Sequence, residues 1–453
     1  MQLRVLIEKT NLALAGFVFF IGILAWLCMD PGHSWDDDFA LYLEQTNAIL
    51  SGNLWQLYDL NRYAMDWSGD TTGPYLYPMG FPILLLPVVA ISGLNWLVIK
   101  VYCFLFFLGG ICLLPSIMRT FELQPKTIYP VIFLVGINYH FVRFGDLIYA
   151  DLPFFFFILL AIYWAICRPS SLLKQVIVGL LIFFAYWIKP LGIVLFMLLL
   201  VEQYRTKRLL HARSYLPYFI FVGCWLLSRW LLPAGDSNHW AWLQQISWQS
   251  IGNNAGWYYQ LLGNYWCIFK PLPEWLQYGI ATFFVAIIGL GIAKAPEKMA
   301  SLLPFCIAYL AVCLCWISFQ GMRLIFPILP FVVVYVVLGI QYLFEQRSNL
   351  ILAGLSLFCL AQTTITCYYY STKDTNEVAT AEMQTVYTFI QQELPPDAII
   401  QFQKPRTLRL FTGRNSCQKN TAELTHILRH KNAIKTPTDK ILLQTPAYEL
   451  IQL

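Results

Sequence analysis

The sequence predicts an all-α polytopic membrane protein that ends in a small α/β domain. Hydrophobic residues make up 58% of the 453 residues and charged residues only 12%, which is about half the charged fraction of an average soluble domain. Apolar runs of about twenty residues recur along the chain, and a helix of that length crosses a lipid bilayer. The mean hydropathy of +0.57 agrees with this class. The composition excludes soluble dehydrogenases, nucleases and secreted disulfide scaffolds.

The apolar runs predict about eleven membrane helices. The first run is long and lacks a small-residue cleavage site, so we expect a retained anchor rather than a signal peptide. The runs on either side of Lys189 and Pro190 are short, and we interpret them as one helix broken near the outer surface. The expected helices are residues 11–29, 96–117, 127–142, 147–167, 174–189, 190–201, 215–232, 276–293, 300–318, 324–344 and 350–370.

Basic residues fix the expected orientation, because cytoplasmic loops carry an excess of Lys and Arg. They occupy the N-terminus and every second short loop, whereas the aspartates before Asp374 lie on or near the opposite side. We therefore expect a cytoplasmic N-terminus and an external C-terminal domain. A bacterial inner membrane is favoured, because no retention signal or glycosylation-rich loop is apparent. The basic loop residues are Arg4, Lys9, Arg119, Lys126, Arg168, Lys174, Arg205, Lys207, Arg208, Arg213, Lys294, Lys298 and Arg347.

The chain is expected to form two domains. Residues 1–370 form the transmembrane domain, and residues 371–453, where the hydropathy falls, form a soluble extracytoplasmic domain. The transmembrane domain has two long external loops, an acidic one at about 30–95 and a Trp-rich one at about 233–275.

Short elements in the tail are typical of a small α/β domain. Residues 398–403 and 406–413 are predicted to be strands separated by a Lys-Pro turn. Residues 421–431 are predicted to form a short helix.

Neither the cysteines nor the net charge predicts a metal centre or a nucleic-acid partner. No CxxC pair occurs among the twelve cysteines, and most of them, Cys367 included, lie in or at the ends of apolar runs. Buried thiols behave as small hydrophobes, so we expect most of them to pack. The net charge of +5 is spread over short loops rather than gathered in one patch, which indicates no nucleic-acid binding.

Three consecutive aspartates, Asp36, Asp37 and Asp38, follow the first membrane helix. From residue 39 the apolar positions recur at three- and four-residue spacing as far as Ser51 and Gly52, which predicts an amphipathic helix on the membrane surface. The dipole of that helix stabilises carboxylates at its start, but capping needs only one of them. Three adjacent carboxylates repel one another, which favours a role with a cation, a substrate or a proton over capping alone.

Asp151 is a second acidic candidate. It lies at the outer start of a membrane helix, where an ionisable residue is costly and indicates function. The alternative is that it caps its own helix. Asp146 is the competing choice, but it lies nearer the loop and is more readily explained as solvated.

Four basic residues reach the outer face: Lys189, Arg323, Arg143 and Arg62. Snorkelling to lipid headgroups explains each of them without a function. Lys189 and Arg323 break the positive-inside bias, however, which makes them candidates for binding a phosphate. The sequence has no P-loop, dinucleotide fingerprint, zinc-protease helix or nucleophile elbow.

Taken in order, these motifs resemble the GT-C class of membrane glycosyltransferases, nearest in pattern to the protein O-mannosyltransferases and the aminoarabinose transferase of lipid A. Asp38, Tyr42 and Gly52 match the spacing of the acidic external loop and surface helix of that class. Residues 77–82, Tyr-Pro-Met-Gly-Phe-Pro, match its Tyr-Pro-x-Gly-x-Pro stretch. Three acids replace the usual pair, so the register among Asp36, Asp37 and Asp38 stays open.

The resemblance continues through three later motifs and covers roughly residues 10–345. Asp151 stands in an Ala-Asp-Leu-Pro-Phe context like that of the second acidic residue of the class. Lys189 precedes Pro-Leu-Gly, and Arg323 precedes a helix with a Pro-x-x-Pro pattern, as basic residues of the class do.

The resemblance implies transfer of a sugar from a polyprenyl-phosphate donor to a lipid, glycan or protein acceptor on the outer face, with inversion. Asp38 would act as the base, and Asp38 with Asp151 would hold a divalent cation, Mg²⁺ or Mn²⁺, if one is used. The implied site residues are Asp37, Asp38 and Asp151 for catalysis, Arg323, Lys189 and Arg62 for the donor phosphate, and Tyr42, Tyr77, Asp146 and Arg143 for the pocket.

Three alternatives stay open. A transporter or flippase favours charges at the membrane midplane and inverted repeats, whereas here the acids gather at one surface and no repeat is seen. A ligase or polymerase would use a lipid-pyrophosphate oligosaccharide at the same face. A non-enzymatic assembly subunit would not need Asp38 and Asp151 together.

Overall fold

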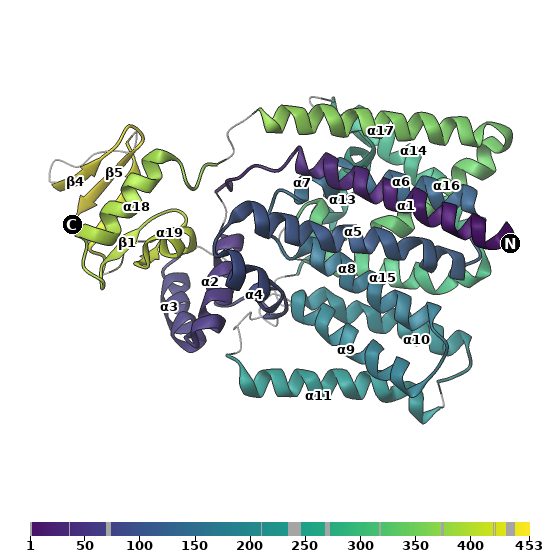
Figure 1. The fold of residues 1–453 in the computed structure, drawn as a ribbon, viewed down its shortest axis with the longest axis horizontal. Helices are drawn as coiled ribbons and strands as arrows, with labels where there is room; N and C mark the ends of the chain where they lie inside the picture. The colour runs from purple at the N-terminus through teal and green to yellow at the C-terminus, as the bar shows by residue number, and fades with distance from the viewer. Residues whose placement is uncertain are drawn as a thin grey trace.

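The computed structural model is a bundle of helices with a small sheet at one end, as the sequence predicts (Figure 1). The N-terminus lies at the end of the bundle opposite the sheet (Figure 1). The structure describes residues 2–35, 37–68, 74–209, 211–233, 246–267, 272–316, 319–372, 376–419, 421, 423–431 and 440–453, and side chains from residue 12 onward.

The helices of the bundle pack mainly in pairs, among them α14 on α16, α9 on α11 and α5 on α8. Their bounds are α1 (Gln2–Trp26), α5 (Trp96–Thr120), α6 (Pro125–Gly136), α7 (Tyr139–Phe144), α8 (Asp151–Ile162), α9 (Leu172–Ile188), α10 (Leu195–Arg205), α11 (Leu216–Leu231), α13 (Trp248–Trp266), α14 (Glu274–Ala293), α15 (Leu302–Leu314), α16 (Leu329–Phe344) and α17 (Ser348–Ser371). One π turn, η2 (Tyr163–Cys167), and the 3₁₀ turns η3 (Pro190–Val194), η4 (Ala212–Tyr215), η5 (Glu297–Ser301), η6 (Met322–Ile325) and η7 (Glu345–Arg347) extend or join them.

Each segment in which the sequence predicts a membrane helix contains a helix among the described residues, although the predicted helix 127–142 is divided into α6 and α7. Within the described residues, four candidate spans are long and apolar enough to cross a membrane: Trp96–Thr120, Glu274–Ala293, Glu297–Leu314 and Leu329–Ser371. The other apolar helices are shorter, so the count of about eleven spans stays a prediction. The expected external loop at 233–275 contains α13, whose Trp266 carbonyl accepts a 3.0 Å hydrogen bond from Gln362 of α17.

Several of the basic loops meet one another. Lys298 contacts Glu122 at 2.7 Å, and the Arg205 guanidinium donates to the carbonyls of Glu297 and Lys298, both at 3.0 Å. The alternation of basic loops in the sequence thus corresponds to a shared face in space, which is the arrangement that a cytoplasmic surface requires.

Three shorter helices lie between the bundle and the sheet: α2 (Asp38–Ser51), α3 (Leu54–Asp66) and α4 (Gly80–Ser92). The α2 helix ends where predicted, because Gly52 adopts a left-handed φ of 74° that favours glycine. Most of α2 is buried, since Phe39 and Leu43 pack into the bundle core while Leu41 packs with α3. The predicted surface helix is therefore covered on more than one side.

The C-terminal α/β unit has a five-stranded sheet in the order β2-β1-β3-β5-β4. The β1 strand is parallel to β2 and β3, whereas β5 is antiparallel to β3 and β4. The core of the unit lies between the sheet and its two helices, with Ile400, Leu408 and Leu450 buried in it. The elements are α18 (Ala381–Glu393), β1 (Ile399–Gln401), α19 (Pro405–Thr412), β2 (Asn415–Cys417), β3 (His426–His430), β4 (Lys440–Gln444) and β5 (Tyr448–Gln452).

Two predictions in the tail were wrong. Residues 406–413 belong to the helix α19, because Pro405 supplies a helical φ in its first turn and Gly413, at φ 68°, ends it. Residues 421–431 include the strand β3, in which burial alternates from His426 to Leu428 and Leu428 pairs with Leu450. The strand predicted at 398–403 is confirmed as β1.

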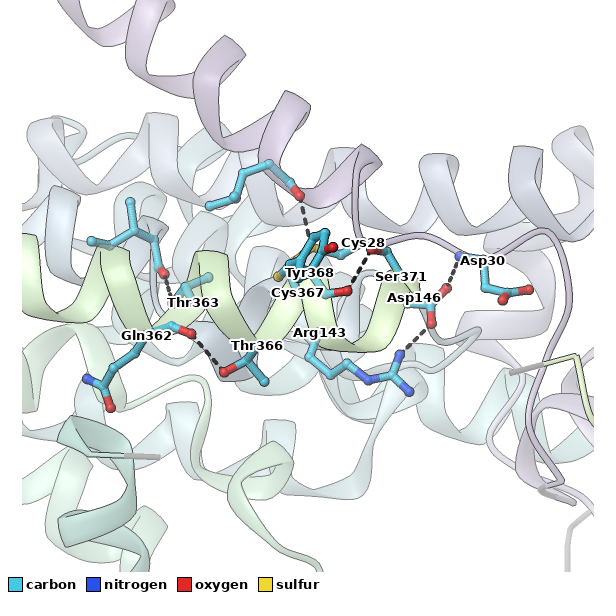
Figure 2. Close-up of a disulfide and its surroundings, with 12 residues drawn as sticks. Cys28, Asp30, Arg143, Asp146, Gln362, Thr363, Thr366, Cys367, Tyr368 and Ser371 are labelled. Atoms are coloured by element: carbon cyan, nitrogen blue, oxygen red, sulfur yellow. Dashed lines mark hydrogen bonds and ion pairs between the residues drawn. A yellow bond between two sulfur atoms is a disulfide. The ribbon is translucent and has the colours of Figure 1, made fainter. Parts of the chain in front are cut away.

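One expected packing thiol is instead part of a disulfide. Cys28, just beyond the end of α1, is bonded to Cys367 near the end of α17, across a sequence separation of 339 (Figure 2). The prediction that Cys367 packs as a free thiol was therefore wrong. The other ten cysteines, all within the described part of the chain, are free.

Candidate active site

Asp38, the first residue of α2, lies at the centre of the candidate site. Its Oδ1 accepts a 2.5 Å hydrogen bond from the Tyr77 hydroxyl, and its Oδ2 lies 3.2 Å from Nη1 of Arg323 in η6. The Arg323 guanidinium also donates to Gln320 at 2.5 Å and lies 5.2 Å from the ring centroid of Tyr149. The side chains of Asp38 and Arg323 keep 25% and 23% of their surface exposed, so a ligand can reach both.

The environment of Asp38 favours its ionised form. Desolvation acts to raise the pKa of the carboxyl, but the charge of Arg323 and the hydrogen bond from Tyr77 outweigh it, so the pKa lies below its usual value. Asp38 is therefore a carboxylate at neutral pH, able to accept a hydrogen bond or a proton.

The neighbouring Asp37 lies in the opposite environment. It is buried, and its Oδ1 accepts hydrogen bonds from the backbone N–H and the hydroxyl of Thr407 in α19, at 3.3 and 3.2 Å. Desolvation raises the pKa of Asp37, although the charges of Arg406 and Lys404 oppose it. Asp37 occupies the N-cap position of α2 without a side-chain capping bond. Asp36 lies outside the described residues.

Asp151 and Lys189 form a second ion pair. Asp151 is buried in the first turn of α8, and its Oδ1 lies 2.7 Å from Nζ of Lys189. Lys189 stands at the break between α9 and η3, where its backbone is extended because Pro190 follows it. Asp151 thus forms an ion pair with the Lys189 side chain and does not only cap the start of α8.

The two ion pairs belong to one cluster. Tyr42, one turn along α2 from Asp38, contacts Tyr77 with ring centroids 4.7 Å apart. Burial raises the pKa of Tyr42, and the charges of Tyr77, Asp38 and Asp151 add to the effect. We call Asp38, Arg323, Asp151 and Lys189 the carboxylate–cation cluster. It joins α2, η6, α8 and the α9–η3 break.

The structure places Asp146 and Arg143 in a different group. Asp146 is buried rather than solvated, which corrects the sequence interpretation, and it pairs with Arg143 and at 2.7 Å with Lys100. It also accepts a 2.8 Å hydrogen bond from the backbone of Asp30, beside the disulfide (Figure 2). Arg62 lies exposed on α3. These contacts give Asp146 a role in anchoring the start of the first loop.

Sequence reasoning missed three residues that shape the site: Lys100, Arg406 and Arg409. Lys100 is a charge within a predicted membrane helix, and that signal alone marks it for attention. Arg406 and Arg409 are three positions apart, which places them on one face of a helix. That face was hidden because residues 406–413 were interpreted as a strand.

The cluster does not provide a metal-binding set. Asp38 and Asp151, the two expected ligands, are each paired with a cationic side chain. Among the residues that the structure describes, no group of three or more His, Cys, Asp or Glu side chains is placed to hold a metal ion.

Comparison with known proteins identifies similar structures but no sequence family. No family model and no curated protein matches the chain. ArnT from Cupriavidus metallidurans, in a structure bound to undecaprenyl phosphate, is similar with a TM-score of 0.61 and 11% identity, over 97% of both chains. The archaeal oligosaccharyltransferase AglB from Archaeoglobus fulgidus, in complex with an inhibitory peptide and a dolichol-phosphate, has a TM-score of 0.58 and 9% identity. That match covers 93% of this chain and 70% of AglB. The resemblance to the GT-C class is thus confirmed at the level of the fold.

Proposed function

We propose that this protein is a membrane glycosyltransferase that moves a sugar from a polyprenyl-phosphate donor to a lipid, glycan or protein acceptor. The observation that carries the proposal is the carboxylate–cation cluster, in which Asp38 pairs with Arg323 and Asp151 with Lys189. The cluster combines an ionised carboxylate with two cations suited to a phosphate. The similar ArnT structure holds undecaprenyl phosphate, which supports a lipid phosphate as ligand.

Asp38 would act on the acceptor. Its carboxylate accepts the proton of the acceptor nucleophile as that atom attacks the anomeric carbon of the donor sugar. The bond between the anomeric carbon and the phosphate oxygen breaks in the same displacement, and its electron pair leaves with the polyprenyl phosphate. A single displacement inverts the configuration at the anomeric carbon.

Arg323 and Lys189 would act on the leaving group. As the bond breaks, negative charge develops on the phosphate, and cations fixed beside it stabilise that charge without reorganising. Asp151, which lies 2.7 Å from Lys189, would keep the ammonium group in place. Arg323 would bind the phosphate while it contacts Asp38, and it would therefore hold the donor phosphate close to the base.

The proposed reaction faces the extracytoplasmic side, in a multi-pass membrane protein of a bacterial inner membrane. In this orientation the N-terminus and the basic loops face the cytoplasm, and the α/β unit lies outside. The contacts of Lys298 and Arg205 within the basic loops support it, because these loops share one face.

The test is transfer of a radiolabelled sugar by the purified protein in lipid nanodiscs. The donors are synthetic polyprenyl-phosphate sugars and one lipid-pyrophosphate oligosaccharide, and the variants are Asp38→Asn and Asp151→Asn. We expect wild type to turn over a polyprenyl-phosphate sugar, and Asp38→Asn to lose about 10²-fold or more in rate, as for a removed general base. Asp59→Asn, an exposed acid on α3, is the matched control.

Three outcomes contradict the proposal. Equal transfer by wild type, Asp38→Asn and Asp151→Asn would make both acids structural. Turnover of the lipid-pyrophosphate oligosaccharide alone would identify a ligase. A folded wild type that uses none of the donors would favour a transporter or flippase.

A further inference from the structure

The helix α19 of the α/β unit lies directly on α2, the helix that begins with Asp38. Arg409 forms a bidentate ion pair with Glu44, with Nε–Oε1 and Nη2–Oε2 distances of 2.7 Å, and both side chains are buried. Two residues earlier in α19, Thr407 donates its backbone N–H and its hydroxyl to Asp37. The α/β unit is therefore docked onto the acidic end of α2 by side chains of a single helix.

Arg406, which precedes Thr407 in α19, is a buried cation beside the site. Its side chain is 1% exposed, and its Nη2 donates to the Pro74 carbonyl at 2.6 Å. Its Nε and Nη1 have no hydrogen-bond partner among the described residues. The guanidinium carbon lies 5.5 Å from the ring centroid of Tyr77, within the range of a cation–π contact. Burial of a charged arginine is costly in free energy, so we expect its buried guanidinium group to serve a function.

Tyr77 connects Arg406 to Asp38. The main chain of Tyr77 is held by α2 itself, because Gln45 donates to its carbonyl and accepts from its N–H, both at 2.9 Å. The ring contacts Arg406, and the hydroxyl donates to Asp38 at 2.5 Å. Since the main chain is fixed on one side, the contact with Arg406 restricts where the hydroxyl points.

We propose that Arg406 is a positioning residue through which the C-terminal α/β unit takes part in the reaction. It holds the Tyr77 ring, and through the Tyr77 hydroxyl it fixes the Asp38 carboxylate against the acceptor. This role rests on the proposed glycosyltransferase function and deepens it, because it makes the α/β unit part of the catalytic apparatus.

Arg406 also contributes to the electrostatics around Asp38. The groups that face the carboxylate are Arg323 from η6, Tyr77 from the segment before α4, and Arg406 from α19. Lys189 lies in the same field, and Asp37 is the adjacent acid. Removing the charge of Arg406 leaves Arg323 in place and raises the pKa of Asp38, because one of the nearby positive charges that lower it is lost.

The kinetic test compares Arg406→Gln and Arg406→Lys with wild type. For Arg406→Gln we expect kcat to fall about ten- to a hundredfold, as for a misplaced reacting group, with the KM for the polyprenyl-phosphate sugar little changed. The acidic limb of the kcat–pH profile moves upward by about one pH unit. Arg406→Lys keeps the charge and recovers part of kcat and most of the pH profile.

Arg414→Gln is the matched control. Arg414 belongs to the same unit, but its Nη2 donates to the carbonyls of Gln391 and Leu394, at 2.9 and 2.8 Å, and not to α2. Thermal unfolding of all variants separates lost stability from lost positioning. Equal losses of kcat in Arg406→Gln and Arg414→Gln, or an unmoved pH profile in Arg406→Gln, would overturn the positioning role.

A second measurement needs no turnover. The Asp38 carboxyl is followed by ¹³C NMR of protein labelled at aspartate C4, and its signal is assigned by its loss in Asp38→Asn. The titration is expected at a higher pH in Arg406→Gln than in wild type. An unchanged titration overturns the positioning role whatever the activity. A shifted titration in a protein that transfers no sugar supports the link from Arg406 to Asp38 and counts against the proposed function alone.

Discussion

Tyr77 and Asp38 are 39 positions apart in the sequence, yet the tyrosine hydroxyl donates a 2.5 Å hydrogen bond to the carboxylate. A hydrogen bond to the charged form of an acid stabilises that form. In the free protein Asp38 is therefore held as a carboxylate from two sides, by Tyr77 at Oδ1 and by Arg323 at Oδ2. The carboxylate is oriented before any acceptor arrives, which is the condition for efficient proton transfer.

Tyr77→Phe removes this hydrogen bond and keeps the ring. We expect kcat to fall about tenfold and the pKa of Asp38 to rise, because one of the interactions that lowers it is lost. The kcat–pH profile measures both effects. Tyr75→Phe is the matched control, since the Tyr75 hydroxyl donates to Asp66 instead. Equal effects of the two substitutions would contradict a specific role of the Tyr77 hydroxyl.

Asp37 and Asp38 are expected to affect stability with opposite signs. The pKa of Asp38 is lowered in the folded protein, so its ionised form stabilises the fold above the unfolded pKa, and this contribution is lost as the pH falls through the folded pKa. The pKa of Asp37 is raised. Its protonated form therefore stabilises the fold below the unfolded pKa, and that contribution is lost as the pH rises through the folded value.

At neutral pH we therefore expect Asp37→Asn to unfold at a higher temperature than wild type and Asp38→Asn at a lower one. An asparagine at 37 keeps an oxygen for the two Thr407 donors without a buried charge. Each difference is on the order of 1 kcal/mol and shrinks in acid. Thermal unfolding from about pH 3 to about pH 8 measures both. Two shifts of the same sign would contradict the different environments of the two acids.

The sequence predicted the helices that contain the site residues better than the contacts between those residues. The apolar spacing predicts the helix that contains Tyr42 and ends at Gly52, whose positive φ agrees with that end, whereas Asp38 was selected among the three aspartates by the resemblance to the GT-C class. Asp151 was identified because an ionisable residue in an apolar segment is costly, and Lys189 because it breaks the positive-inside bias. That these two charges meet at 2.7 Å depends on how α8 and α9 pack, which no single-helix pattern contains.

The largest error concerned the residues that cover the site. In the segment 406–413 apolar and polar residues alternate loosely, so that strand and helix patterns both fit, and the capping residues Pro405 and Gly413 decide for a helix. The same choice hides the contacts of Arg406 and Arg409. The burial of Asp146 was missed for a similar reason, because its partner Lys100 lies 46 positions away in the sequence, in α5.

Arg409→Met is expected to loosen the α/β unit from α2. It leaves Glu44 buried without its partner, which costs about 3–5 kcal/mol for a buried pair. Glu44→Gln combined with Arg409→Met is expected to recover much of the loss. Limited proteolysis of the α/β unit and thermal unfolding measure the effect.

The matched control is an exposed ion pair of the same length. Lys298 and Glu122 also lie 2.7 Å apart, but their side chains are 56% and 64% exposed. Lys298→Met is therefore expected to change stability by about 0–1 kcal/mol. A loss of that size in Arg409→Met would show that the Glu44 pair does not hold the α/β unit in place.

Arg323→Gln is expected to weaken binding of polyprenyl phosphate about tenfold or more, because a charge-assisted contact to the phosphate is removed. The affinity of wild type is expected to fall more steeply with salt concentration than the affinity of Arg323→Gln, since the variant makes one ionic contact fewer. Equilibrium binding of the lipid phosphate alone, in nanodiscs at two salt concentrations, measures both. Arg119→Gln, an exposed arginine at the end of α5, is the control. Equal affinities of Arg323→Gln and Arg119→Gln would remove Arg323 from the phosphate site.

The disulfide between Cys28 and Cys367 tests the orientation of the whole protein. It lies at the start of the loop that is predicted to be external, beside Asp30 and Asp146 (Figure 2), and disulfides persist in oxidising compartments. Both cysteines are buried, so the protein is taken from membranes without reductant and unfolded in the alkylating reagent, which is expected to modify these two cysteines only after reduction. Cys112, free and exposed on α5, provides an unpaired thiol for comparison once the membranes are opened.

Replacing both cysteines by serine is expected to lower stability by about 2–4 kcal/mol, as for the loss of a native disulfide. The reason is that the bond joins the end of α1 to the end of α17 and thereby reduces the conformational entropy of the unfolded chain. Thermal unfolding of Cys28→Ser/Cys367→Ser with and without reductant measures the loss, and reduced wild type should match the variant. Alkylation of Cys28 and Cys367 without reduction would place this end of the bundle in a reducing compartment. Asp38 would then face the cytoplasm, and the proposed extracytoplasmic site would be wrong.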